Sequence, residues 1–306
     1  MGGRIEDQEV NLADLYKEKI SPDDVQIELA NLGKYNPIII IDEFDRVVDE
    51  NAKTLMSDTI KTLSDYSVNA TVIIVGVAES IDNLIKKHES ISRALTQVQM
   101  PRMSDDEIAD VIAKGLGRLG MRISEDSIWR IKFYAKGLPY YAHSLGLYSA
   151  RAAIREKVLR VNESHVEAAI IAVIENIDQT IKVLYDRAVY TAKKDTIYKQ
   201  VLLACALAET DKLGRFPANA VVVPLETIMG KRYEIPSFAF HLKQFCESER
   251  GSVLEKIGLP RKYKFRFKDP IYQPFIIMEG VRDGLITQEI AENLTVSREP
   301  QLPIGP

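Results

Sequence analysis

Four consecutive isoleucines, Ile38–Ile41, constrain the fold of this chain more than any other feature. A short β-branched run bounded by Pro37 and by charged residues is typical of a strand that is buried on both faces. Residues 71–77 repeat this pattern, and residues 96–100 predict a short third strand. Because helical segments alternate with these strands, we expect an α/β fold with parallel pairing and right-handed crossovers. The expected helices cover residues 21–32, 49–63 and 81–88.

Acidic residues follow the isoleucine run directly. Open parallel sheets bind ligands at the carboxyl ends of their strands, which is where Asp42 and Glu43 are expected. An adjacent Asp and Glu at this place has the form of a Walker B segment. One carboxylate then holds the Mg²⁺ of a nucleotide, and the other orients or deprotonates the attacking water. We therefore predict that Asp42 holds Mg²⁺ and Glu43 is catalytic, whereas Asp45 is structural. The alternative is that these acids are helix caps or surface residues.

The phosphate-binding part of such a site is not found in the sequence. No G-x-x-x-x-G-K-[ST] loop, whose backbone N–H groups would cradle the phosphates, occurs among the 306 residues. The chain therefore carries one half of an ATPase signature.

Composition limits the classes of protein to which the chain can belong. A length of 306 residues suggests about two domains, and 46% hydrophobic residues exclude a disordered chain. The net charge of −4 argues for neither nucleic acid nor an anionic membrane as partner of the whole molecule, although a local basic patch stays open. The four histidines show no metal-ligand spacing with each other or with the two cysteines. Without a recognisable spanning segment or signal peptide, we expect a cytoplasmic protein with no membrane contact.

After Pro101 the pattern becomes helical. Ser104 and Glu107 form a capping box for a helix to about residue 119, Ser124 precedes a second helix, and Asn162 caps another over residues 163–176. Leu138 and Pro139 interrupt and restart the helical pattern between them. We predict a partial α/β core over residues 1–101 and a helical lid over residues 102–180.

Residues 190–280 have the pattern of a winged helix. Three helices, near 195–209, 223–229 and from 236 onward, precede two alternating runs around a Gly/Pro turn, which predict a hairpin. The functional interpretation of the basic hairpin is contact with DNA phosphates, and the alternative is a solvated strand face. Because the third helix has few cations, we favour a protein-interaction or autoregulatory role. The tail, residues 281–306, is expected to be disordered. The cations that would contact DNA are Arg261, Lys262, Lys264 and Arg266, with Lys256 and Lys268 nearby.

Four of these segments occur in the same order as in a known protein family. The run from Ile38 to Asp45, the segment Gly76–Ser80, the segment 88–93 and Gly137-Leu138-Pro139 together resemble bacterial AAA+/STAND-like P-loop ATPases with an Orc1/Cdc6-like layout. The resemblance covers about residues 21–275. It implies a P-loop α/β core, a lid and a winged helix. It also implies ATP and Mg²⁺ as ligands, and a homo-oligomer or a protein partner.

The resemblance further implies roles for individual residues. Glu79 or Ser80 falls at the sensor position, which contacts the γ-phosphate or the water. Arg93 matches the arginine finger that stabilises transition-state charge on a neighbouring subunit. Pro139 belongs to the lid motif that packs near the adenine. The alternatives are a helix cap for Glu79 and Ser80, a surface arginine for Arg93 and a helix start for Pro139.

In this family the first strand and the P-loop precede Walker B by many tens of residues, whereas 36 residues precede Pro37 here. We therefore expect an N-terminally shortened sequence: an expression fragment, a misassigned start or a natural split protein. A P-loop from another chain is the less economical alternative. Three functions stay open: an ATP-driven molecular switch, an ATPase-inactive regulatory or interaction module, and a winged-helix DNA-binding module.

Overall fold

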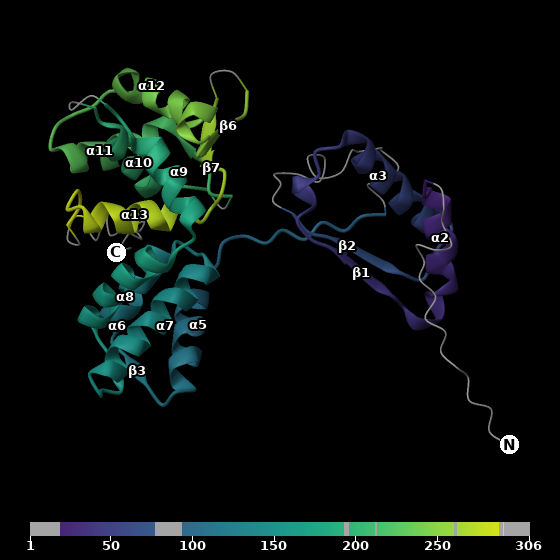
Figure 1. Ribbon diagram of the computed structural model, residues 1–306, viewed down its shortest axis with the longest axis horizontal. Helices are drawn as coiled ribbons and strands as arrows, with labels where there is room; N and C mark the ends of the chain where they lie inside the picture. Colours follow the sequence, from purple (N-terminus) through teal and green to yellow (C-terminus); the bar gives the residue numbers. More distant parts are fainter. Residues whose placement is uncertain are drawn as a thin grey trace, which may run out of the picture. The chain divides into compact units, whose positions relative to one another are not determined.

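The computed structural model describes residues 19–76, 94–192, 196–211, 213–259, 262–287 and 290. The chain forms two compact units, residues 1–100 and 101–306. Figure 1 labels their elements. In the described ranges the first unit is α/β and the second is mostly helical, so the expected mixed α/β class is confirmed.

The first unit is built on two short parallel strands. β1 (Ile38–Ile41) pairs with β2 (Thr71–Ile74) residue for residue, so that Ile41 lies opposite Ile74. The crossover contains α3 (Glu50–Asp65), as parallel pairing requires, and α2 (Pro22–Asn31) precedes β1. In Figure 1, α2 and α3 lie on the same side of the two strands. The expected parallel pairing through a helix is confirmed.

Capping side chains set the starts of both helices. The Ser21 hydroxyl accepts a hydrogen bond from the N–H of Asp24 at 3.3 Å, and the Asp24 carboxylate accepts one from the N–H of Ser21 at 2.8 Å. This is a capping box, with Pro22 in the first turn. Asp49 caps α3 by accepting from the N–H of Asn51 at 2.8 Å. Both helices begin where the sequence predicts.

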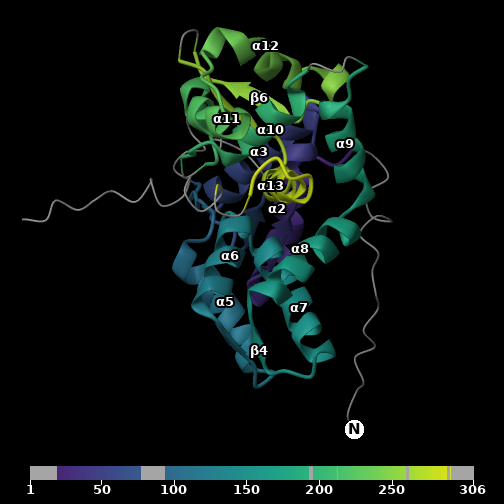
Figure 2. The same ribbon diagram turned by 90° about the vertical axis from the view of Figure 1, so that its left-hand side faces the viewer.

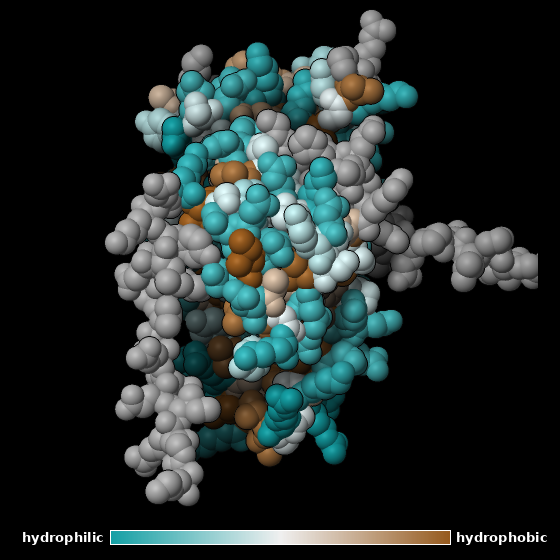
Figure 3. Space-filling model, turned by 90° about the vertical axis from the view of Figure 1, so that its right-hand side faces the viewer, coloured by the Kyte–Doolittle hydropathy of each residue, from teal (hydrophilic) through white to brown (hydrophobic). Residues whose placement is uncertain are grey.

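The expected burial of both strands on both faces is wrong. Ile39 and Ile41 are partly buried, whereas Ile38 and Ile40 are 66% and 64% exposed. In β2, Ile73 is 41% exposed. The helices cover one face of this two-stranded sheet, so alternate side chains on the other face meet solvent. On the side of the molecule drawn in Figure 3, brown apolar side chains likewise lie exposed among teal hydrophilic ones.

The expected strand over residues 96–100 is also wrong. Residues 95–100 have no regular structure, and Val98 and Met100 are 75% and 89% exposed. An extended segment forms a strand when a neighbour satisfies its backbone N–H and C=O groups. No described strand pairs with this segment. The helix expected over residues 81–88 lies outside the described residues.

The second unit begins with a helical bundle. The capping boxes of Ser104 with Glu107 and of Asn162 with His165 start two of its helices, as the sequence predicts for Ser104 and Asn162. A two-residue parallel pair, β3 (Arg122–Ile123) with β4 (Arg160–Val161), joins two of its connections. The helices are α5 (Asp105–Gly117), α6 (Glu125–Ala135), α7 (Pro139–Arg155), α8 (Glu163–Asn176) and the additional α9 (Gln179–Val189).

The remainder of the second unit carries a small antiparallel sheet. β6 (Leu254–Ile257) and β7 (Lys264–Phe267) form the expected hairpin, and β5 (Phe216–Pro217) adds to β7, in the order β5-β7-β6. Its helices are α10 (Tyr198–Leu207), α11 (Val222–Met229), α12 (Ile235–Phe245) and α13 (Tyr272–Arg282). None of the helices in the described ranges combines the length and the hydropathy needed to cross a membrane.

One hydrophobic core runs through the second unit. Its buried side chains extend from Ile108 in α5 to Ile286 beyond α13. The hydroxyl of Tyr141 in α7 donates to the carbonyl of Ile271 at 2.7 Å. The regions predicted as lid and winged helix therefore share a core, and their division into separate domains stays a prediction. Residues 281–287 differ from the expected disordered tail, since α13 continues to Arg282 and Ile286 is 1% exposed.

Candidate functional site

An anchored phenylalanine shapes the turn that follows β1. Phe44 is 5% exposed and packs with Ile60 in the core of the first unit. The N–H of Phe44 donates to the carbonyl of Val75 at 3.0 Å, and the N–H of Val75 donates to that of Ile41 at 2.9 Å. Hydrogen bonding between the two chain segments thus continues past the strand ends. It fixes the turn at the carboxyl edge of the sheet, where α/β folds bind ligands.

Asp42 and Glu43 are both exposed at this edge. Glu43 has φ of 55° and ψ of 32°, a left-handed conformation that costs a non-glycine residue about 1 kcal/mol. Asp42 Oδ1 accepts a hydrogen bond from the N–H of Glu43 at 2.8 Å. Glu43 Oε1 lies 3.4 Å from Arg46 Nη2, and both of these side chains are more than half exposed. Backbone strain of this kind is concentrated at functional sites.

The carboxylates of this turn fit a magnesium ion whose other ligands come from outside the protein. In the described ranges, no group of three or more His, Cys, Asp or Glu side chains is placed to hold a metal ion. In nucleotide sites, Mg²⁺ is held by one or two carboxylates together with waters and phosphate oxygens. Asp42 would be the carboxylate of such a set, with phosphate and water as the other ligands, and this role stays a prediction.

Three predicted site residues, Glu79, Ser80 and Arg93, lie outside the described residues, and their roles stay predictions. β2 ends at Ile74, which lies opposite Ile41. Val75 and Gly76 therefore leave the sheet at the same edge as the acidic turn.

Pro139 lies in the second unit, where it starts α7 after the N-cap residue Leu138. The helix-start role is confirmed. The preceding Gly137 has φ of 75°, and a Cβ there would lie 2.7 Å from the carbonyl oxygen of Met103. The N–H of Met103 donates to the carbonyl of Gly137 at 2.9 Å. Because Asp42 and Pro139 belong to different units, a nucleotide between them stays a prediction.

An unpredicted arginine holds this turn in place. Arg102 Nη1 donates to the carbonyl of Lys136 at 3.1 Å and to Gln273 Oε1 at 2.6 Å. Gln273 Nε2 donates onward to the carbonyl of Ala206 at 2.8 Å. Burial lowers the pKa of the Arg102 guanidinium, although an arginine keeps its charge in proteins. Its partners Lys136 and Gln273 lie far from it in the sequence, so no local pattern predicts this role.

The hairpin cations lie on one face, as expected, but acids hold two of them. On β7, Phe265 and Phe267 are buried while Lys264 and Arg266 are partly exposed. Lys264 Nζ donates to Asp211 Oδ2 at 3.0 Å, and Arg266 Nε donates to Glu255 Oε1 at 2.8 Å. These pairs argue against phosphate contacts by Lys264 and Arg266, because DNA would compete with an acid already bound. Lys262 is exposed, and Arg261 lies outside the described residues.

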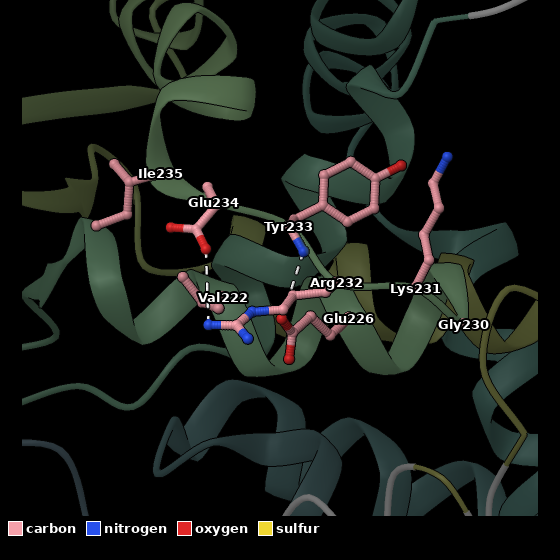
Figure 4. Close-up of a pocket in the computed structure, with 8 residues that line it drawn as sticks. All are labelled: Val222, Glu226, Gly230, Lys231, Arg232, Tyr233, Glu234 and Ile235. Atoms are coloured by element: carbon pink, nitrogen blue, oxygen red, sulfur yellow. Dashed lines mark hydrogen bonds and ion pairs between the residues drawn. The ribbon is translucent and has the colours of Figure 1, made fainter.

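A hollow of about 610 Å³ lies between α11 and the start of α12 (Figure 4). The N–H of Tyr233 donates to Glu226 Oε1 at 3.3 Å, and Arg232 Nη2 lies 3.6 Å from Glu234 Oε1. One ion pair and one backbone hydrogen bond thus engage charged groups of the rim. None of the predicted site residues lines this hollow. The lining residues are Val222, Glu226, Gly230, Lys231, Arg232, Tyr233, Glu234 and Ile235.

Comparison with known proteins finds similarity among solved structures. Neither protein-family models nor curated protein sequences give a match. The RuvB Holliday junction branch migration motor of Thermotoga maritima is 14% identical, with 83% of this chain and 74% of that chain covered and a TM-score of 0.42. Cdc6p from Pyrobaculum aerophilum is 15% identical (91% and 73% covered, TM-score 0.38). The ORC2 protein of Aeropyrum pernix, in ADPNP–ADP complexes, is 14% identical (90% and 70%, TM-score 0.42).

These three structures are AAA+ P-loop ATPases. Identities near 14% and TM-scores below 0.5 transfer no residue roles to this chain.

Proposed function

We propose that this chain supplies the Walker B carboxylates of an ATP-driven molecular switch. The observation that carries the proposal is the pair Asp42 and Glu43, exposed together at the carboxyl edge of two parallel strands. Asp42 would hold the Mg²⁺ of the nucleotide, and Glu43 would position a water molecule for in-line attack on the terminal phosphate. Bound Mg²⁺ would neutralise charge on the phosphate oxygens. The anchored Phe44 keeps both carboxylates at this edge.

The roles expected of the other residues complete this proposal. Glu79 or Ser80 senses the terminal phosphate, and Pro139 contributes to the lid near the base. Arg93 stabilises charge on the nucleotide of a neighbouring copy, which makes the active form an oligomer.

The phosphate cradle must come from a segment that this sequence does not contain. In the described ranges β1 and β2 pair only with each other, and Ile38 and Ile40 are exposed. Parallel sheets are normally covered on both faces, and two strands alone are marginally stable. A further strand and helix would complete the sheet and bring a phosphate-binding loop to the edge that carries Asp42 and Glu43.

A second candidate, an ATPase-inactive interaction module, is favoured by the same missing loop. The two candidates differ in what they predict for Glu43. In a switch its carboxylate is needed for turnover, whereas in an inactive module it is an exposed acid without a chemical role.

The substitution Glu43→Gln distinguishes the two candidates in protein purified from the native host, so that any partner with the cradle is retained. The switch predicts that this variant keeps bound ATP and loses turnover by about 10²-fold or more, the usual effect of removing a general base. Asp42→Asn is expected to lose Mg²⁺-dependent nucleotide. Asp65→Asn, which removes an exposed carboxylate at the far end of α3, is the matched control.

The readouts are the nucleotide released on denaturation and the rate of phosphate release. Equal turnover in parent and Glu43→Gln would refute the role assigned to Glu43. Preparations without nucleotide and without turnover would favour the inactive module. The 306-residue chain alone is expected to bind ATP weakly, and tight Mg²⁺-dependent binding would contradict an external cradle.

A further inference from the structure

Two turns at one end of the helical bundle lie side by side. One joins α5 to β3, and the other joins α7 to β4. Arg122 lies opposite Arg160 in the β3–β4 ladder, and the N–H of Arg122 donates to the carbonyl of Leu159 at 2.9 Å. Figures 1 and 2 show this end of the bundle away from the part that carries β6 and β7. We call residues 118–122 and 154–160 the bundle tip.

The bundle tip is basic in a chain whose net charge is −4. Its one acid, Glu156, is engaged, since its Oε2 lies 3.0 Å from His165 Nε2. Acids also open the helices that follow the two strands, and Glu163 among them accepts a hydrogen bond from Ser124 at 2.8 Å. Like charges opposite each other in a ladder repel, and Glu163 close to Arg160 offsets part of this charge. A further anion would stabilise the remaining cations. Its cations, all exposed, are Arg118, Arg122, Arg155, Lys157 and Arg160.

Apolar side chains are exposed among these cations. Leu119 and Leu159 are 58% and 65% exposed, and Ile154 and Val158 are 54% and 40% exposed. The backbone holds them there, because Lys157 turns the chain with φ of 60° and the N–H of Val158 donates to the carbonyl of Ala153 at 3.0 Å. Single exposed apolar residues are ordinary, but a contiguous group marks a contact surface.

We propose that the bundle tip binds the anionic surface of a lipid membrane. Arginine and lysine are attracted to anionic headgroups, and the leucines enter the boundary between headgroups and acyl chains. Phosphates of a nucleic acid would attract the same cations but would leave Leu119 and Leu159 in water. The expectation of no membrane contact rests on the net charge of the whole chain and on the lack of a recognisable spanning segment, whereas this surface depends on local charge. Peripheral binding needs no membrane-spanning helix.

Flotation of the full chain with lipid vesicles tests this proposal. Vesicles of phosphatidylglycerol and phosphatidylcholine in equal parts should bind the chain at least about tenfold more tightly than phosphatidylcholine alone, and salt should weaken the binding. The double variants Leu119→Ser/Leu159→Ser and Arg118→Gln/Lys157→Gln should each lose about tenfold or more. Matched controls at exposed positions outside the tip, Ile171→Ser and Lys231→Gln/Lys243→Gln, should bind like the parent.

Binding of the chain to a labelled DNA duplex tests the alternative, in which the same cations contact nucleic-acid phosphates. No binding of the parent to anionic vesicles would overturn the proposal. So would vesicle binding that survives the leucine double variant, or tight binding to DNA that needs Arg118 and Lys157 but not the leucines. Circular dichroism of each variant checks that the fold is retained. Neither the vesicles nor the variants involve Asp42 or Glu43, so this result is independent of the proposed ATPase function.

Discussion

Glu43 and Gly137 both have a positive φ, of 55° and 75°. Glu43 lies in an exposed turn, with its carboxylate 3.4 Å from the Arg46 guanidinium. Gly137 lies against the carbonyl oxygen of Met103 and the Cβ of Arg102, and it leads into the start of α7. At the residue scale, a positive φ is therefore compatible with a glutamate at position 43, whereas the close contacts at position 137 require glycine.

Gly137→Ala is expected to lower the free energy of unfolding by about 2 kcal/mol or more, because a new Cβ would meet backbone atoms at 2.7 Å. The control is Gly146→Ala in α7, where no atom lies within 4 Å of a new Cβ. It should raise stability by up to about 1 kcal/mol through helix propensity. Urea denaturation followed by the fluorescence of Trp129 measures both changes. Equal effects would show that the Gly137 turn relaxes without strain.

Asp211 links the loop before β5 to the hairpin. Partial burial opposes its ionisation. Hydrogen bonds from the backbone of Arg215, from the side chains of Lys264 and Arg215 and from the backbone of Leu213 outweigh this effect, so the pKa of Asp211 falls to about 2. A carboxylate with a lowered pKa stabilises the fold above its unfolded pKa, about 3.9, and loses that contribution as pH falls toward 2.

Asp211→Asn should therefore destabilise the protein by about 1 kcal/mol near neutral pH, a value reduced for solvent screening at this partly exposed site. The difference from the parent should shrink as pH falls below about 4. Urea titrations over this range measure it. Asp110→Asn, which removes an exposed pair with Lys114, should change stability by less than about 0.5 kcal/mol. A difference that does not change with pH would contradict the assigned pairing.

At the scale of elements, β1 shows how one strand of identical residues acquires two different faces. Ile41 packs beside the Phe44–Ile60 cluster, whereas Ile40 is 64% exposed. The residues are chemically identical, so only the helices on one side of the sheet distinguish them. The exposed face is also where the further helix of the proposed switch would pack, whereas its further strand would pair at an edge of the sheet.

In the isolated chain, Ile41→Thr should destabilise the first unit by about 1 to 2 kcal/mol, whereas Ile40→Thr should change its stability by less than about 0.5 kcal/mol. Hydrogen exchange of amides in β1 and β2 reports this, because the one tryptophan, Trp129, lies in the second unit. Comparable losses from both substitutions would mean that the outer face is covered in solution.

At the scale of the whole molecule, the second unit holds together through a single core. Phe275 in α13 is fully buried and meets Tyr185 of α9 edge to face, with ring centroids 5.5 Å apart. The same core continues to α5 and α6. Because the regions predicted as lid and winged helix share this core, a change in one is expected to affect the other.

Phe275→Leu should therefore lower the urea midpoint reported by Trp129 in α6 as much as the midpoint reported by circular dichroism. The cavity left by the lost ring atoms is expected to cost about 1 to 3 kcal/mol. An unchanged urea midpoint of the Trp129 fluorescence would show that the helical bundle unfolds separately from the part that carries α13.

The local features of this protein follow from short stretches of its amino-acid sequence. The caps at Ser21, Ser104 and Asn162, the strand of isoleucines and the acids that follow it depend on groups within a few residues of one another. Most described helices could therefore be predicted, and so could the order of acids and strand in the candidate site.

The fold of the chain determines which face of β1 is covered, that residues 95–100 pair with no described strand, and that Asp211 holds Lys264. It also brought Arg122 beside Arg160 and added β5 and α13 to the core. Each of these depends on atoms that approach from distant parts of the chain. Burial and ion pairing are properties of those long-range contacts, and no local pattern of residue types contains them.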